Sequence, residues 1–527
     1  MSTPGNQAML VVGFLLFMAL CGFLCLLTDS DQDDSHLAQP LIRPLRPWQH
    51  GLAISGTAMS SVSLLGITGL VALTGGDGMT LLLGMVLSMV LLALVLAEPL
   101  RRAGHRTVSD ALARRMPQRS VRVALALVTL LVCLCFLVLQ LATVGTMTAF
   151  LIGLPGDGPK TACIVMIGVL MVSLAVTGGL RGTALIQIVK VVILLLTMGA
   201  VVAIILHRAD WNPERLLGGA ASRSGLGDAF LGFGVQYGPG ALGIAERLGT
   251  AAGLPLAIAC LPQVTMRVLA VPSPRATRSA MRWAVAQMLL ISALLAVIGL
   301  GAAAVMGANA LVTADPTGSS SILVLSHALD PDGFLLSAVS CAVFLAALAT
   351  ITDVTLAAAG AVGHDLYAQV MHGGEVSRAR VMTFARWSAA VIGGLAVVLA
   401  AFASSWPLLV LSALGVALSS SALGPALVYG LLWPRFTSQG ALWCLYGSTV
   451  LSLALTAVSP LISGSASAVF PDLDFHLIPL TVPAVVTLPA GFALGWLGSI
   501  LPRRKAAAAA QRFEELTQAE FAGVDAD

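Results

Sequence analysis

Apolar runs long enough to cross a lipid bilayer recur along the whole of this 527-residue chain. A transmembrane helix needs about 20 mostly apolar residues, because each helical residue rises only about 1.5 Å. Hydrophobic residues make up 57% of the chain and charged residues only 10%, which leaves too few polar groups to cover a soluble globule. Aromatic residues are few and period-two alternation is absent, which argues against an outer-membrane barrel. The sequence therefore predicts an all-α integral membrane protein.

About thirteen transmembrane helices are expected from the length of the apolar runs and from their interruptions. The segment 207–248 is apolar but rich in Gly and Pro, and it indicates either a re-entrant or a surface segment. The predicted spans are 8–27, 52–74, 79–98, 121–151, 161–177, 182–206, 249–270, 284–306, 333–362, 384–403, 406–431, 440–459 and 477–501.

The charged loops predict the orientation of the chain, because cytoplasmic loops carry an excess of Lys and Arg. Arginine clusters follow the third, seventh and ninth spans and end the last one, whereas the opposite loops carry aspartates. We therefore expect the N-terminus outside and the C-terminus in the cytoplasm. The arginine-rich ends are marked by Arg101, Arg102, Arg114, Arg115, Arg275, Arg278, Arg380, Arg386 and Arg504.

One carboxylate stands inside a predicted span. Asp353 lies in an apolar run from Phe334 to Val362 that contains no other Asp, Glu, Lys, Arg or His. A charge at that depth costs about 2.5 to 3.5 kcal/mol on insertion scales, so a cation, a proton or a water-filled cavity must compensate for it. We expect Asp353 either to complete a cation site or to take up a proton. The alternative is a carboxylate in the wet cytoplasmic half of the span.

Two other spans carry polar groups of interest. The second span reads GLAISGTAMSSVSLLGITG, and its Ser60, Ser61 and Ser63 lie among glycines that permit local unwinding and close helix contact. Ordinary small-residue packing would explain the same pattern. In the span 182–206, Gln187 and Lys190 share one face at i and i+3. Lys190 is expected to face an anionic substrate, to pair with Asp353, or to reach the cytoplasmic interface by its long stem.

Five segments in order carry a resemblance to a known family. The chain resembles the sodium:solute symporter family, and more closely its acetate permease branch, the cation/monocarboxylate symporters, over roughly residues 45–500. The matching segments are GLAISGTAMSSVSLLGITG, the Gly178–Gly179 turn with GTALIQIVK, LPQVTMRVLAV, GHDLYA and GVALSSSALGPALVYGLLWPRFTSQGA.

The resemblance implies a LeuT-like inverted repeat of five plus five helices, with broken helices at the substrate site. The chain then divides into an additional helix and linker, a first repeat, an extracellular connection, a second repeat, two additional helices and a cytoplasmic tail. These parts cover residues 1–50, 51–206, 207–248, 249–435, 436–502 and 503–527.

The resemblance also implies a sodium site between the second and ninth spans. It would use the carbonyls of Gly56, Met59 and Ala346 and the side chains at Ala349 and Thr350. Ala349 supplies no hydroxyl, so the site is one oxygen short.

The position of Thr57 commonly carries an aspartate in acetate permeases, and Thr57 has no charge. Asp353 shares the helical stripe of Ala346, Ala349 and Thr350 and is expected to replace that missing charge.

For the substrate, a helix N-terminus near Gln263 is expected to present N–H groups to a carboxylate. Either Leu254–Pro255 or Leu261–Pro262 marks the break, and Gln187 is placed either at the substrate or as a structural hydrogen-bonding group. The predicted substrate-binding residues are Ser60, Ser61, Ser63, Gln187, Lys190 and Gln263.

The expected function is symport, in a bacterial plasma membrane, of a short-chain monocarboxylate such as acetate or propionate. The coupling ion is sodium or a proton, and no other cofactor and no nucleic acid is expected. A transporter of another small solute, such as an amino acid or a vitamin, and a non-transporting sensor remain the alternatives. No Walker A or HExxH pattern suggests an enzyme.

Overall fold

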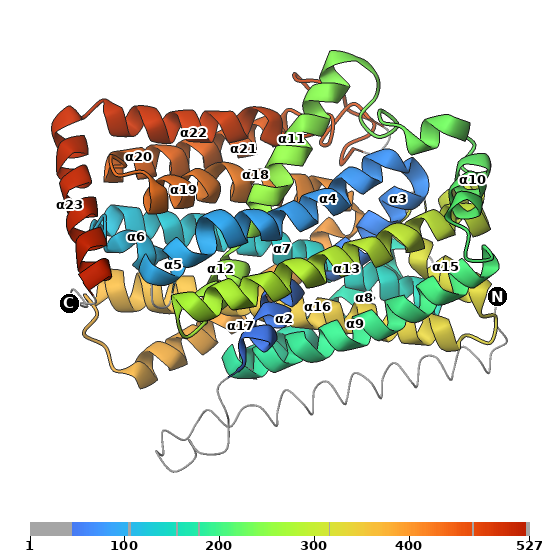
Figure 1. Ribbon diagram of the computed structural model, residues 1–527, viewed down its shortest axis with the longest axis horizontal. Helices are drawn as coiled ribbons and strands as arrows, with labels where there is room; N and C mark the ends of the chain where they lie inside the picture. The colour runs from blue at the N-terminus through green and yellow to red at the C-terminus, as the bar shows by residue number, and fades with distance from the viewer. Residues whose placement is uncertain are drawn as a thin grey trace, which may run out of the picture.

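The computed structural model is a bundle of long helices that run roughly side by side (Figure 1). It describes residues 45–103, 107–153, 156–177, 180–315, 317–465 and 468–522. The predicted first span, 8–27, and the Gly178–Gly179 turn lie outside the described residues.

Within the described ranges, 10 helices are long and apolar enough to cross a membrane, and two bent helix pairs meet the same criteria together. Each predicted span from 52–74 onward overlaps one of these elements, so the all-α membrane class is confirmed, while the total of thirteen stays a prediction. The long elements are α4 (Gly76–Leu91) with η3 (Leu92–Leu96) and α5 (Ala97–Ala103), α7 (Arg119–Ile152), α8 (Asp157–Thr177), α9 (Leu180–Arg208), α11 (Gly240–Ala259), α13 (Pro274–Met306), α16 (Phe334–Gly360) with η5 (Ala361–Met371), α17 (Arg378–Phe402), α18 (Leu408–Leu418) with η7 (Ser419–Leu423) and α19 (Gly424–Leu432), α20 (Ser438–Leu442) with η8 (Trp443–Gly447) and α21 (Ser448–Ala457), and α22 (Ala484–Ile500), followed by α23 (Arg503–Ala522).

Short helices fill connections in which the sequence predicted none. α10 (Pro213–Arg223) packs against α13 and has Pro213 in its first turn, where the missing N–H costs nothing. The Asn212 side chain caps α10 by accepting a hydrogen bond from the Glu214 N–H at 2.8 Å. Further short helices are η4 (Gly227–Leu231), α14 (Ala308–Ala314) and α15 (Ser321–Leu329).

The predicted second span is a broken helix. α2 (Pro47–Ala58) ends where Met59 takes an extended conformation, with φ −94° and ψ 122°. The chain then resumes as η2 (Ser63–Ile67) and α3 (Thr68–Thr74), and the two halves are bent by 69°. The break exposes the last carbonyls of α2, which have no partner inside the helix.

The predicted span 249–270 is broken as well. α11 ends at Ala259 and α12 (Pro262–Leu269) begins two residues after Cys260, with Leu261 at ψ 133°. Proline has no N–H and disfavours helical geometry in the residue before it, so Pro262 both stops one helix and starts the next. Leu261–Pro262 therefore marks the break, whereas Pro255 lies inside α11.

α16 lies at the centre of the bundle. It contacts α7, α8, α9, α12, α15 and α17, and it is the most enclosed of the candidate spans in the described chain. α2 packs against α13, α9 and α12, and its Gly51 permits close approach, since a Cβ there would collide with the Ala280 carbonyl. Both broken helices therefore meet the interior around α16.

One end of the bundle, which we call the arginine-rich end, holds the arginine-bearing elements α5, the start of α13 and α23 together with α6 (Val108–Ala113), whereas α10 and α15 lie at the other end (Figure 1). Because α10 itself carries Arg215 and Arg223, the separation of charge between the loops and the orientation of the termini in the membrane stay predictions.

Candidate functional site

Asp353 is completely enclosed, with 0% of its surface exposed. Helices α12, α2 and α9 each supply a donor to its carboxylate. Arg267 forms an ion pair with Oδ1 and approaches Oδ2 with Nε at 3.3 Å. Thr57 Oγ1 donates to Oδ2 at 2.6 Å and Gln187 Nε2 at 2.9 Å. The alternative of a wet, cytoplasm-facing carboxylate is therefore wrong.

Arg267 is the residue that the sequence analysis missed. It is 3% exposed and also donates to the Thr183 hydroxyl. The signal was present, because an arginine within the apolar span 249–270 is as costly in a membrane as the aspartate of another span. One positive charge in one span and one negative charge in another, each without a partner in its own span, together predict an ion pair between the two spans.

Lys190 is fully buried and its ammonium lies at the break of α2. Nζ donates to the Gly56 carbonyl at 2.5 Å and to the Met59 carbonyl at 2.9 Å. Its stem therefore does not reach the membrane interface, and the snorkelling alternative is wrong. The hydrogen bonds of Nζ go to these carbonyls, while the ion-pair partner of Asp353 is Arg267.

The residues expected to bind a cation meet at this same point. Thr350 Oγ1 donates to the Ala346 carbonyl at 2.8 Å and reaches the Met59 carbonyl at 3.4 Å. The Ala349 carbonyl accepts from Gln187 Nε2 at 3.2 Å. The predicted oxygens thus lie together between α2 and α16, but Lys190 supplies the positive charge beside them.

The predicted substrate residues fall into two groups, those that bind neighbouring helices and those that lie at the break of α2. The Gln187 amide donates both of its hydrogen bonds to α16, so it links α9 to α16, and its role as a substrate ligand stays a prediction. Ser61 Oγ donates to Gln140 Oε1 of α7 at 2.6 Å. Ser60 and Ser63 are only partly buried, and their hydroxyls lie 3.3 Å apart just beyond the break.

The second break has its own polar groups. Gln263 is 2% exposed, and its Oε1 has no hydrogen-bond partner among the described residues. In the first turn of α12, Pro262 has no N–H, and the N–H groups of Val264 and Thr265 both bind the Leu261 carbonyl. The Gln263 N–H is the remaining donor of that described turn. On the other side of the break, Ser419 of η7 donates to the Ala257 carbonyl at 2.8 Å.

An apolar groove between α8 and α17 has a different character. It is lined by residues such as Val165, Val169, Val398 and Phe402, and several of these side chains are exposed. Such a lining suits lipid tails and carries no charge, and its two hydroxyls, those of Thr161 and Ser173, donate to Ser404 and to the Val169 carbonyl. The polar junction of the broken helices is therefore the candidate site for a solute.

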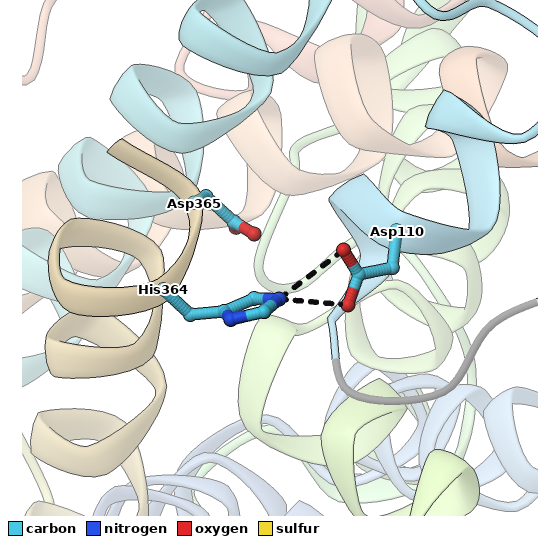
Figure 2. Close-up of side chains that lie close together, drawn as sticks. All are labelled: Asp110, His364 and Asp365. Atoms are coloured by element: carbon cyan, nitrogen blue, oxygen red, sulfur yellow. Dashed lines mark hydrogen bonds and ion pairs between the residues drawn. The ribbon is translucent and has the colours of Figure 1, made fainter. Parts of the chain in front are cut away.

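A second charged cluster lies where α6 meets η5 (Figure 2). His364 Nε2 donates to Asp110 at 2.9 Å, and Thr107 Oγ1 donates to Asp365 at 2.8 Å. Arg122 Nη1 lies 2.8 Å from Asp110 and 3.7 Å from Asp365. Burial alone would raise the pKa of Asp110, but its bonds with His364 and Arg122 lower that pKa to about 2.

Asp110, His364 and Asp365 lie close enough together to hold a metal ion. Arg122 lies within ion-pair distance of both carboxylates, and His364 and Thr107 also bind them, so a metal would have to displace these contacts and would bring a further positive charge beside the guanidinium. We therefore interpret the cluster as an ion-pair contact that joins α6, α7 and η5 at the arginine-rich end.

Comparison with known proteins identifies relatives over most of the chain. The profile of the sodium:solute symporter family matches residues 42–447. A monocarboxylic acid transporter of Corynebacterium glutamicum is 31% identical over 463 residues, covering 86% of this chain and 84% of the relative. An uncharacterized symporter of Bacillus subtilis, YwcA, is 31% identical over 501 residues, covering 94% of this chain and 95% of the relative.

Solved structures show the same fold at low identity. A Na⁺-coupled sialic acid symporter in a substrate-bound outward-open state has a TM-score of 0.70 at 14% identity, covering 93% of this chain and 98% of that one. MhsT in complex with L-phenylalanine has a TM-score of 0.52 at 13% identity, covering 86% of this chain and 98% of that one. The LeuT-like architecture predicted from the sequence is confirmed by these likenesses.

Proposed function

Because the chain belongs to the sodium:solute symporter family, we propose that it takes up a short-chain monocarboxylate, such as acetate or propionate, together with a cation. The cation is sodium or a proton, and the cycle is alternating access around a site at the two broken helices. In this proposal the chain works in a bacterial plasma membrane, with its arginine-rich end in the cytoplasm.

The observation that carries the substrate class is the charge of the buried junction. Arg267 and Lys190 bring two positive charges to it and Asp353 brings one negative charge. When all three groups are ionised, one positive charge is unbalanced in a site that water does not screen. An excess buried charge is costly, so an anionic solute that enters the junction is stabilised by neutralising it.

The geometry of the breaks supports a small carboxylate rather than a large anion. The N-terminus of α12 supplies the Gln263 N–H and the positive end of a helix dipole, which favours one carboxylate group. Ser60 and Ser63 offer hydroxyls at the break between α2 and α3. These few donors match a monocarboxylate, whose remaining atoms are a short apolar or polar tail.

Sequence similarity supports the same class. The relative from Corynebacterium glutamicum is named a monocarboxylic acid transporter, and it matches this chain along most of its length. The proteins with solved structures are too distant in sequence to indicate a substrate, and their likeness concerns the fold alone.

Counterflow in proteoliposomes tests the proposal. Vesicles that contain the purified full chain are loaded with unlabelled pyruvate, and entry of labelled pyruvate is measured in both sodium and sodium-free media. Pyruvate is chosen because a stronger acid stays ionised and crosses protein-free vesicles slowly. Acetate and propionate should compete for entry, while an amino acid and a vitamin should not.

A matched pair of glutamine variants connects the uptake to the site. Gln263→Ala removes the side-chain amide beside the α12 N-terminus, keeps the backbone N–H and should weaken exchange, whereas Gln511→Ala, which removes an exposed glutamine of α23, should leave it unchanged. Absence of exchange for every monocarboxylate in both media would remove the proposed substrate class. Competition by the amino acid or the vitamin alone would point to the corresponding alternative.

A further inference from the structure

The residues that the family resemblance assigns to sodium do not fit a sodium ion in this chain. Lys190 Nζ lies 2.5 Å from the Gly56 carbonyl and 2.9 Å from the Met59 carbonyl, the two α2 oxygens expected to bind the ion. An ammonium group carries the same single charge as sodium and donates hydrogen bonds where the ion would accept lone pairs. Lys190 therefore satisfies both oxygens without a free ion.

Charge opposes the presence of both cations. A sodium ion bound to these carbonyls would lie about one hydrogen-bond length from Nζ, and like charges in a dry site repel strongly. Lys190 is among the largest fully buried side chains of the described chain, so solvent does not reach its ammonium group to screen the repulsion. One of the two cations must be absent, and Lys190 is held there by its own helix.

The rest of the site is also poor in oxygen. Ala349 has no hydroxyl, and its carbonyl accepts from Gln187. Asp353, which would supply the missing ligand one turn later, is engaged by Arg267, Thr57 and Gln187. Hard cations collect many oxygen ligands, whereas an ammonium group needs only three acceptors.

We infer that Lys190 is a tethered cation that takes the place of the coupling sodium ion between α2 and α16, so that this carrier works without sodium at that position. The inference rests on the proposed monocarboxylate transport and adds that sodium is not the coupling ion at this site. Of the two coupling ions considered, it leaves the proton.

The wild-type protein gives the first test. Pyruvate counterflow is compared in sodium and in N-methyl-D-glucamine medium, and binding of radioactive sodium to the purified protein is measured. Coupled ligands change each other's affinity by about 5- to 150-fold, so a sodium-coupled carrier should show a large stimulation. We expect the wild-type rates to differ by less than about twofold and sodium binding to be absent at this position.

The variant Lys190→Ala gives the second test, with Lys505→Ala at an exposed position of α23 as the control. Lys190→Ala should lose exchange in sodium-free medium and regain part of it when sodium is added. The variant leaves the predicted sodium ligands open to an ion, namely the carbonyls of Gly56, Met59 and Ala346 and the hydroxyl of Thr350. Lys505→Ala should behave as wild type. Full sodium-free exchange in Lys190→Ala would overturn the inference.

Two results separate this inference from the proposed function. Wild-type exchange that requires sodium would overturn the tethered-cation role and leave monocarboxylate transport standing. Absence of wild-type exchange in both media would overturn the proposed function, and with it the inference that depends on it. If Lys190→Ala fails to fold, the wild-type comparison still decides the outcome.

Discussion

The buried pair between Arg267 and Asp353 should behave as one unit when it is mutated. Both side chains are almost fully enclosed, at 3% and 0% exposed, and they share an ion pair that Thr57 and Gln187 extend by two further hydrogen bonds to the carboxylate. Removing one member of such a pair leaves a buried charge without its counter-charge and costs about 3 to 5 kcal/mol. Asp353→Asn and Arg267→Met should each lower the free energy of unfolding by that amount.

The double variant should cost much less than the sum of the two. If the single losses were independent, they would add to about 6 to 10 kcal/mol, whereas removing both charges leaves no unpaired ion and should cost only about 3 kcal/mol. Denaturant unfolding of the detergent-solubilised protein, followed by its helical circular dichroism, measures the four free energies.

A surface pair provides the matched control. Asp210 and Arg215 are also paired, but they are 71% and 63% exposed. The same cycle, with Asp210→Asn and Arg215→Met, should give a coupling below about 1 kcal/mol. Additive losses at the buried pair, or single losses as small as those at the surface, would refute the reasoning about the core.

Three further predictions concern helix contact, substrate and pH. Gly56→Ala would place a Cβ 3.0 Å from Val191 Cγ2 and should destabilise the protein by about 1 to 3 kcal/mol in the same unfolding assay, whereas Gly66→Ala, whose nearest atom is at 3.9 Å, should cost little. Gln263→Ala, which removes the side-chain amide but keeps the backbone N–H, should raise the KM for pyruvate by about 2- to 10-fold if the amide donates one hydrogen bond, and an unchanged KM would exclude the Gln263 side chain from the site. Because the pKa of Asp110 is lowered from 3.8 to about 2, its charged partners stabilise the fold by about 2 kcal/mol above pH 4, and this contribution is lost as the pH falls toward 2. The stability difference between wild type and Asp110→Asn should therefore shrink between pH 4 and pH 2, and a difference that is constant with pH would contradict the ion-pair interpretation.

The sequence predicted the spans well because apolar length is a local property. The runs from residue 79 to residue 206 and around α16 each became one long helix, since the bilayer demands about 20 apolar residues whatever their neighbours are. The short helices α10 and α15 were missed, because both are too short to be recognised by apolar length and form against α13, and α10 also depends on the Asn212 cap.

The breaks were predictable only in part. Both Leu–Pro pairs satisfy the same local rule, and only the structure distinguishes the proline that starts α12 from the one inside α11. The position of Met59 was marked by glycines and serines nearby, yet no single residue there forces an extended conformation.

The candidate site was predicted at the level of its helices but not of its pairings. Thr350 lies 3.4 Å from the Met59 carbonyl, and Asp353, one turn beyond Thr350, binds Thr57 of the same broken helix, while their role in binding a cation stays a prediction. Arg267 was not identified, and the carbonyl partners of Lys190 were not predicted, because the helical stripe of one span does not reveal which distant side chain lies opposite it. That information lies in the packing of α9 and α12 against α16.

Accumulation of pyruvate in sodium-free proteoliposomes tests the central claim most directly. The interior is made alkaline relative to the medium, and the internal and external concentrations of labelled pyruvate are compared with those of protein-free vesicles. We expect the wild-type carrier to accumulate pyruvate above its external concentration under the proton gradient alone. Accumulation that appears only under an inward sodium gradient would contradict the role of Lys190 as the resident cation.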